Sequence, residues 1–478
     1  MSYKNKLYNM NRQKTQGYVV RLTLIATLGG LLFGYDTAVI SGTVGSLEKF
    51  FIEPFALAET AANSRLGFVV SSALIGCIIG GLSGGIVSMK LGRKKGLILA
   101  ALLFLVSALG SAMPEMFIRP VGTGDHTLIY VFVFYRVVGG IGVGLASMLS
   151  PMYIAEVSPP DIRGKLVSWN QFAIIFGMLV VYFVNYFIAL QGNDDWLNRT
   201  GWRWMFASET IPAALFFVLL FFVPETPRYL VLRSQTDRAF KVLEKINGSE
   251  RASLILQEIK ATLTGKSGKL FSYGVTVIVI GILLSVFQQF VGINVVLYYA
   301  PEIFKNMGTR TDTALLQTII VGAINLTFTV IAIFTVDRFG RKPLQIIGAL
   351  GMAFFMFALG FTFFFQKMGV GALIFMLGYV ASFAMSWGPV TWVLLSEIFP
   401  NRIRGRAMAV AVAAQWISNY LVSWTFPMMD KSSLLIRTFH HGFAYWIYGV
   451  MGLLAAVFVW KLVPETKGKT LEEIERLY

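Results

Sequence analysis

The chain alternates between long apolar runs and shorter polar segments. A helix that crosses a bilayer needs roughly 17–25 mostly apolar residues. Six runs of this length precede a long polar stretch and six follow it. They lie at approximately 19–41, 66–88, 97–113, 128–150, 166–189, 203–223, 273–298, 313–336, 343–365, 370–396, 405–428 and 441–463. The pattern predicts an all-α membrane protein with twelve transmembrane helices in two six-helix bundles.

The polar stretch divides the chain. We expect an N-terminal bundle at 1–223, a linker at 224–270, a C-terminal bundle at 271–463 and a short tail at 464–478. Charged and apolar side chains alternate in the linker, which is typical of amphipathic helices on a membrane surface.

Composition agrees with a membrane protein and explains the net charge. The chain is 56% hydrophobic and only 14% charged, against about a quarter charged in a soluble domain. The net charge of +16 raises the question of nucleic-acid binding. However, roughly three quarters of the 41 Lys and Arg residues fall in or beside alternate loops, as the positive-inside rule expects. We therefore expect an integral plasma membrane protein with both termini in the cytoplasm and no cleaved signal peptide.

A short cassette occurs twice, about 240 residues apart, and such recurrence indicates a duplicated half-protein. The first copy contains Gly92-Arg93-Lys94, Glu156, Arg163-Gly164-Lys165 and Pro224-Glu225-Thr226, and the second contains Gly340-Arg341-Lys342, Glu397, Arg404-Gly405-Arg406 and Pro464-Glu465-Thr466. Two related halves in a membrane protein favour a transporter that binds its substrate between them. The Arg clusters are either anchors that fix topology or reversible partners of Glu156 and Glu397 that close the cytoplasmic side. Recurrence in both halves favours the second reading.

Three charged residues fall inside apolar runs: Asp36, Arg136 and Glu209. Each costs at least about 2.5–3.5 kcal/mol at the centre of a membrane helix, so each needs a partner or water. For Arg136 and Glu209 a structural ion-pair role and a functional role are equally compatible with the sequence. Asp36 has few local partners, and we expect it to carry a proton whose binding depends on how close Arg136 lies.

Two runs are interrupted by helix-disturbing residues. Gln288-Gln289-Phe290-Val291-Gly292-Ile293-Asn294 interrupts the seventh run, and Trp387-Gly388-Pro389 interrupts the tenth. Broken helices at membrane depth are tolerated where they line a cavity. Uncharged hydrogen-bonding and aromatic side chains gather nearby, which suits a neutral sugar because amides both donate and accept. The residues are Gln171, Gln288, Gln289, Asn294, Tyr298, Asn325, Trp392, Gln415 and Trp416.

At these positions the chain resembles the sugar porter family of the major facilitator superfamily. The motifs are Val138-x-Gly140-Ile141-x2-Gly144 followed by Tyr153-x2-Glu156-x6-Arg163, Val336-Asp337-Arg338-Phe339-Gly340-Arg341-Lys342, Pro224-Glu225-Thr226-Pro227-Arg228 and Pro464-Glu465-Thr466-Lys467-Gly468. The resemblance covers almost the whole chain and is strongest to members that carry D-xylose with a proton. It implies the major facilitator fold and alternating access by the two bundles.

The resemblance also implies roles for individual residues. Asp36, Arg136 and Glu209 would couple transport to a proton. The sugar would meet Phe33, Gln171, Gln288, Gln289, Asn294, Tyr298, Asn325, Trp392, Gln415 and Trp416. The cytoplasmic gate would comprise Arg93, Glu156, Arg163, Glu225, Asp337, Arg341, Glu397, Arg404 and Glu465. D-xylose is the expected substrate and D-glucose a second one, in a monomeric protein without cofactor or metal.

The sequence departs from the family in two places. Met178 stands where the xylose carriers have Gln, which removes a hydrogen bond from the sugar pocket. Met89 stands where the first loop usually has Asp, which weakens the first-half gate. An uncoupled carrier stays an alternative, although Asp36 favours coupling, and a sugar sensor is disfavoured by the short tail. No nucleophile–base pair or metal-ligand cluster indicates an enzyme.

Overall fold

The structure is a computed structural model that describes residues 3–120, 125–159, 162–263, 271, 274–400 and 403–467, without the side chains of 3–15, 250, 262, 263 and 337. Within these ranges the chain is helical throughout, with no strand. The predicted all-α class is confirmed.

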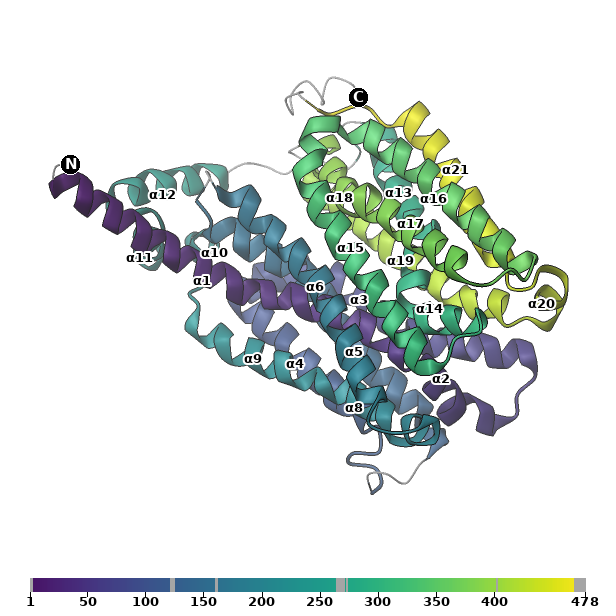
Figure 1. The fold of residues 1–478 in the computed structure, drawn as a ribbon. Helices are drawn as coiled ribbons and strands as arrows, with labels where there is room; N and C mark the ends of the chain where they lie inside the picture. The colour runs from purple at the N-terminus through teal and green to yellow at the C-terminus, as the bar shows by residue number, and fades with distance from the viewer. Residues whose placement is uncertain are drawn as a thin grey trace.

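The first half of the chain is one group of helices, which we call the N-terminal half (Figure 1). Short 3-10 and π-helical turns (η) join or extend several of its helices. Its elements are α1 (Tyr3–Val39), η1 (Ile40–Gly42), α2 (Val44–Leu47), η2 (Glu48–Ile52), η3 (Glu53–Phe55), α3 (Glu59–Lys90), α4 (Arg93–Ala112), η4 (His126–Leu128), α5 (Ile129–Val157), α6 (Arg163–Ala189), α7 (Asp194–Trp196), η6 (Leu197–Gly201), α8 (Trp202–Ser208), α9 (Thr210–Leu219) and η7 (Leu220–Phe222).

The second half forms a similar group, the C-terminal half, drawn in green and yellow in Figure 1. Its elements are α13 (Thr276–Phe290), α14 (Ile293–Asn306), α15 (Thr311–Phe339), α16 (Arg341–Phe364), α17 (Val370–Met385), α18 (Trp387–Ile398), α19 (Arg404–Asp430), α20 (Ser433–Phe439) and α21 (Phe443–Leu462).

Three short helices lie between the halves in sequence: α10 (Pro227–Leu232), α11 (Thr236–Asn247) and α12 (Ser249–Leu263). They lie within the segment expected to be the linker, and α11 buries Leu243 and Ile246. In Figure 1 they lie at the same end of the molecule as the start of α1 and the end of α21, and we call this the linker end. The opposite end carries α2 and α20.

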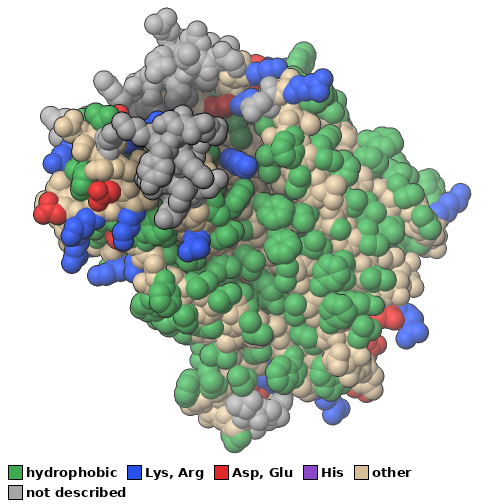
Figure 2. All heavy atoms as spheres, turned by 60° about the vertical axis from the view of Figure 1, so that its left-hand side comes forward, with side chains coloured by type: hydrophobic (Ala, Val, Ile, Leu, Met, Phe, Trp, Pro, Cys, Tyr) green, Lys and Arg blue, Asp and Glu red, His purple; other side chains and the backbone are tan. Residues whose placement is uncertain are grey.

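Eleven helical segments of the described chain are long and apolar enough to cross a membrane, and they coincide with eleven of the predicted runs. The twelfth run, 405–428, is α19, which is less apolar because it begins at Arg404 and carries Gln415 and Asn419. Figure 2 shows a wide face of hydrophobic side chains with charged side chains towards its two ends. This distribution fits a bilayer around the middle of the bundle.

Both predicted helix breaks are present. Val291 and Gly292 separate α13 from α14, and Gly292 has a φ of +92°, a left-handed conformation that favours glycine. Ser386, with φ −131° and ψ −87°, separates α17 from α18. Between α8 and α9, Glu209 keeps a helical backbone, with φ −63° and ψ −24°.

The halves meet along a few helices. In the N-terminal half, α3 and α4 pack on α5, and α1 packs on α6. Between the halves, α19 packs on α3, α15 packs on α6, and α14 contacts α1, η1 and α2. Several of these interface helices, namely α1, α6, α14, α15 and α19, carry predicted site residues.

Candidate functional site

A buried charge cluster lies in the N-terminal half. Nη1 of Arg136 on α5 donates to Oδ1 of Asp36 on α1 at 2.7 Å, and Nη2 donates to the backbone oxygen of Asp36 at 3.1 Å. The Arg136 and Asp36 side chains are 1% and 0% exposed. The guanidinium also lies over the ring of Phe206, 5.3 Å from its centroid. The structure therefore brings two of the three predicted charges into direct contact.

Glu209 completes the cluster. It is fully buried and lies within electrostatic reach of both Asp36 and Arg136. With both groups ionised, no donor among the described residues reaches either carboxylate oxygen of Glu209 or Oδ2 of Asp36. The two carboxyls lie within hydrogen-bond range of each other, so a proton on either one can bridge them. One cation thus faces two carboxyl groups in an environment without water contact. If both carboxyls ionise, a net negative charge is buried at large cost, so the cluster can hold one exchangeable proton.

Gly34 lets α1 and α6 approach closely beside this cluster. A side chain at Gly34 would overlap the backbone oxygen of Ile174. Met178 lies one turn further along α6, is 8% exposed and belongs to the apolar core. The residue that replaces the expected Gln therefore packs between helices.

Three side-chain amides form a one-way hydrogen-bond chain in the C-terminal half, which ends on two backbone oxygens. Nδ2 of Asn294 donates to Oε1 of Gln289 at 2.5 Å, and Nε2 of Gln289 donates to Oε1 of Gln288 at 3.4 Å. Nε2 of Gln288 then donates to the backbone oxygens of Trp387 and Gly388, at 2.9 and 3.3 Å. The chain joins the α13–α14 break to the α17–α18 break, so both predicted interruptions belong to one polar site.

Aromatic rings link this site to the N-terminal half. Phe33 on α1 and Trp416 on α19 have ring centroids 5.6 Å apart. Tyr298 is buried and its hydroxyl accepts from Nδ2 of Asn419 at 3.4 Å. Asn419 was not among the predicted sugar contacts, although its position one helical turn after Gln415 and Trp416 places it on the same face of α19.

The other predicted sugar contacts have free polar atoms or partial exposure. Oε1 of Gln415 is buried without a hydrogen-bond partner among the described residues, so it can accept from a ligand hydroxyl. Trp392 is 36% exposed, Gln171 is partly buried and Asn325 is 5% exposed.

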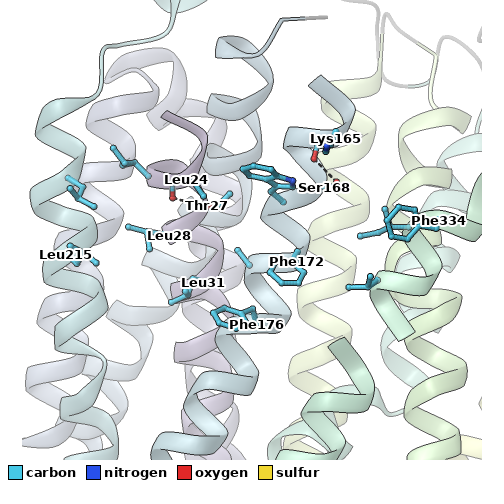
Figure 3. Close-up of a pocket in the computed structure, with 16 residues that line it drawn as sticks. Leu24, Thr27, Leu28, Leu31, Lys165, Ser168, Phe172, Phe176, Leu215 and Phe334 are labelled. Atoms are coloured by element: carbon cyan, nitrogen blue, oxygen red, sulfur yellow. Dashed lines mark hydrogen bonds between the residues drawn. The ribbon is translucent and has the colours of Figure 1, made fainter. Parts of the chain in front are cut away.

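A cavity lies apart from these residues. It has a volume of about 950 Å³ and is lined by apolar residues of α1, α6, α9 and α15, such as Leu28, Phe172, Leu215 and Phe334, with Lys165 at its edge (Figure 3). It contains none of the predicted sugar-contacting residues. Because its walls offer few polar groups, it is a poor site for a polyhydroxyl ligand.

The duplicated cassette forms the same structure twice at the linker end. Nη2 of Arg93 contacts Oε1 of Glu156 at 2.7 Å, and Nη2 of Arg341 contacts Oε1 of Glu397 at 3.0 Å. The threonine hydroxyls of the Pro-Glu-Thr motifs donate to the same glutamates: Thr226 to Glu156 at 2.6 Å and Thr466 to Glu397 at 2.5 Å. Each pair joins helices of one half.

Glu225 and Glu465 cap the helices that follow the Gly-Arg-Lys turns. Oε1 of Glu225 accepts from the backbone N–H of Arg93 at 3.0 Å, and Oε1 of Glu465 accepts from that of Arg341 at 3.1 Å. A carboxylate at a helix N-terminus is favourable because the first N–H groups are unpaired. Burial raises the pKa of the Glu225 carboxyl, although the backbone N–H groups of Thr226, Lys94 and Arg93 oppose the shift.

The remaining gate residues behave differently. Arg163 is exposed, and its nearest described acceptor is the backbone oxygen of Ser158 at 3.5 Å. Nε of Arg404 donates to the backbone oxygen of Phe399 at 3.2 Å. The sequence offered two arginine clusters as partners of the glutamates in each half. In this conformation the arginines of the Gly-Arg-Lys motifs form the ion pairs, Arg93 with Glu156 and Arg341 with Glu397. The side chain of Asp337 lies outside the described residues.

Polar contacts between the halves gather at the opposite end. Lys431 forms an ion pair with Glu48, and the backbone N–H of Ser433 donates to Oε1 of Glu59 at 2.6 Å. Nε1 of Trp424 donates to the backbone oxygen of Ser64 at 3.1 Å. Deeper in the bundle, the hydroxyl of Tyr182 donates to the backbone oxygen of Leu297 at 3.0 Å. The halves are thus held together at the end away from the linker.

Known proteins are similar to this chain in sequence and in structure. The chain is 64% identical over 480 residues to the D-xylose-proton symporter of Escherichia coli (strain K12), covering 98% of this chain and 97% of that protein. It is 45% identical over 473 residues to the glucose facilitated diffusion protein of Zymomonas mobilis, covering 98% and 99%. The inward open conformation of the xylose transporter XylE from E. coli matches with a TM-score of 0.88 and 62% identity, covering 96% of this chain and 100% of that chain. Residues 22–478 match the family described as sugar (and other) transporter, and the chain belongs to that family.

Proposed function

We propose that this protein imports D-xylose together with a proton, by alternating access of its two halves. It acts as a monomer in a bacterial inner membrane, with the linker end in the cytoplasm. Sequence identity to a D-xylose-proton symporter along nearly the whole chain supports the substrate pair. The basic residues of the linker-end loops support the orientation.

The observation that carries proton coupling is the Asp36–Arg136–Glu209 cluster. Its two carboxyls share one buried cation and lie within hydrogen-bond range of each other. Protonation of the cluster balances its charge. Movement of α1 against α5 changes the Asp36–Arg136 separation, and with it the affinity for the proton.

The amides and aromatic rings near the two helix breaks form the sugar site in this proposal. Gln415 offers an unpaired acceptor, and Asn294 and Gln289 keep unused donor or acceptor positions at the end of the amide chain. Phe33 and Trp416 provide an apolar surface for the C–H face of the sugar. Because these residues come from both halves, the affinity for the sugar depends on the position of one half relative to the other.

We assign the conformation to an inward-facing state. The inter-half contacts of Lys431 with Glu48 and of Ser433 with Glu59 keep the external end closed. The high TM-score to an inward-open relative supports the same assignment. The pairs Arg93–Glu156 and Arg341–Glu397 stay within their halves, so they brace each bundle at the cytoplasmic end.

The test is proton movement driven by sugar in proteoliposomes. Addition of D-xylose outside wild-type vesicles should make the external medium more alkaline, because each imported sugar removes a proton. Asp36→Asn should remove this signal while radiolabelled D-xylose still exchanges across the membrane. Downhill xylose movement without a proton signal in wild type would exclude symport.

The second candidate function is uncoupled carriage of a hexose or pentose. The 45% identity to a glucose facilitated diffusion protein favours it, whereas the buried carboxyl pair beside Arg136 opposes it. The same vesicles decide between the two, since only a symporter accumulates xylose above the external concentration when a proton gradient is imposed.

A further inference from the structure

Gln345 is a buried amide outside the sugar-contacting set. It lies near the start of α16 and is 0% exposed. Its side chain donates from Nε2 to Oγ1 of Thr391 at 3.0 Å, and its backbone oxygen accepts from Nε1 of Trp387 at 2.9 Å. Trp387 and Thr391 are also 0% exposed. Oε1 of Gln345 has no hydrogen-bond partner among the described residues, so the bond from Nε2 offsets only part of the cost of burying this amide.

The two partners of Gln345 lie at the start of α18, one on its first turn and one on its second. Trp387 is the first residue of α18, directly after the irregular Ser386, and Thr391 follows one turn later. A helix start that follows a break has no preceding turn to hold it. Gln345 therefore binds the start of α18 to α16 at two points: its side chain bonds Thr391, and its backbone oxygen bonds Trp387.

The same turn supplies the acceptors for Gln288. The backbone oxygens of Trp387 and Gly388 accept from Nε2 of Gln288, which uses both of its N–H bonds. The direction of Gln288 is thereby fixed, with its oxygen left to accept from Gln289. The directions of Gln289 and Asn294 follow, because each donates to the previous amide.

We propose that Gln345 is a positioning residue for sugar recognition, an inference that rests on the proposed sugar transport. Gln345 holds the start of α18, and the first turn of α18 orients Gln288. The orientation of Gln288 then sets which donors and acceptors Gln289 and Asn294 offer to the sugar hydroxyls. Loss of the Gln345 anchor lets the amides flip or rotate. The site then loses discrimination between hydroxyl patterns as well as affinity.

The experiment measures Kd for D-xylose and its monodeoxy analogues in the purified full-length protein by calorimetry. Gln345→Met removes the amide at similar volume, and Thr391→Val removes its acceptor with little change of shape. We expect each to weaken D-xylose binding about three- to tenfold, as for loss of one buried hydrogen bond, since the bond from Trp387 to the backbone of Gln345 is kept in both variants. We expect the preference for D-xylose over the analogues to shrink as it does in Gln288→Met, and the double variant to be no worse than Gln345→Met.

The matched control is Thr318→Val. Thr318 is 1% exposed on α15 and its hydroxyl donates within its own helix to Ala314 at 2.9 Å. It should leave both Kd and sugar preference unchanged. An unchanged Kd in Thr391→Val, or an equal loss for D-xylose and every analogue, overturns the positioning role. If wild type itself binds no D-xylose, the proposed function fails, and that result is distinct from a wild type that binds while the variants keep full discrimination.

Discussion

Arg136 holds Asp36 by two hydrogen bonds, one to its side chain at 2.7 Å and one to its backbone at 3.1 Å, where neither side chain meets water. The side-chain bond depends on the charge of Asp36, and the backbone bond does not. Loss of the Asp36 charge therefore loosens the link between α1 and α5 without breaking it. Glu209 is close enough to become the counter-charge in its place.

This arrangement predicts non-additive effects on stability. Asp36→Asn alone should cost little free energy of unfolding, because Glu209 can ionise beside Arg136. Glu209→Gln alone should also be tolerated. The double variant leaves a buried, unpaired guanidinium and should cost about 3–5 kcal/mol. Chemical unfolding in detergent, arranged as a double-mutant cycle, measures the coupling.

A matched control for this cycle is Glu244→Gln with Asp36→Asn, since Glu244 is exposed on α11. The losses in free energy of unfolding caused by these two substitutions should be additive. Additive losses for Asp36 and Glu209 as well would show that the two carboxyls do not exchange roles around Arg136.

The buried charges and the helix breaks could be predicted from the sequence because both are formed by residue types that are unusual within an apolar membrane span. Asp36 and Arg136 stand out in apolar runs, and the glycine at 292 interrupts a polar motif within a membrane span. The partner of Glu156 could not be chosen, because Arg93 and Arg163 both lie in short basic loops near it. Only the fold places Arg93 at 2.7 Å.

Other relationships carried no sequence signal. Glu48 and Lys431 lie in polar segments more than 380 residues apart, and the packing of α19 on α3 brings them together. Gln345 gives no sign of its role, since an amide at the start of a membrane helix normally faces lipid head groups or water. Its burial depends on the position of α18 after the break at Ser386.

The ion pair between Lys431 and Glu48 is predicted to favour the inward-facing state. The two side chains are 27% and 25% exposed, so the pair contributes about 0.2–1 kcal/mol, or up to about a fivefold change in the equilibrium between states. Lys431→Met should raise the population with an open external end. Distance measurements between spin labels on Thr60 and Leu434, both exposed near this end, report it.

Exchange of the two charges, Glu48→Lys with Lys431→Glu, should restore the original distance distribution. Arg310→Met is the control, because the pair of Arg310 with Asp312 lies within the C-terminal half. A distribution that Lys431→Met leaves unchanged would rule out a role of this pair in the equilibrium.

The repeated caps are predicted to contribute equally to stability. Glu225 and Glu465 each accept backbone N–H bonds at the start of a helix. Replacement of either by Gln removes the charge and should cost about 1 kcal/mol. Thermal unfolding of Glu225→Gln and Glu465→Gln should show similar decreases, with Glu244→Gln as the exposed control. A decrease confined to one half would show that the cassette copies are not equivalent.

His441, between α20 and α21, is predicted to make stability depend on pH. Burial lowers its pKa, but the hydrogen bond at 3.1 Å and the charge of Asp430 outweigh burial, so the pKa is raised above its usual 6.5. A raised histidine pKa means that protonation favours the folded state. The contribution is fully present below pH 6.5 and is lost as pH rises through the raised pKa. Asp430 also accepts from Asn306 at 2.9 Å, and Lys431 is the neighbouring cation that opposes protonation. Melting temperatures of wild type and His441→Gln should therefore differ most at pH 5.5 and converge towards pH 8.5. A constant difference across this range would show that His441 contributes through packing alone.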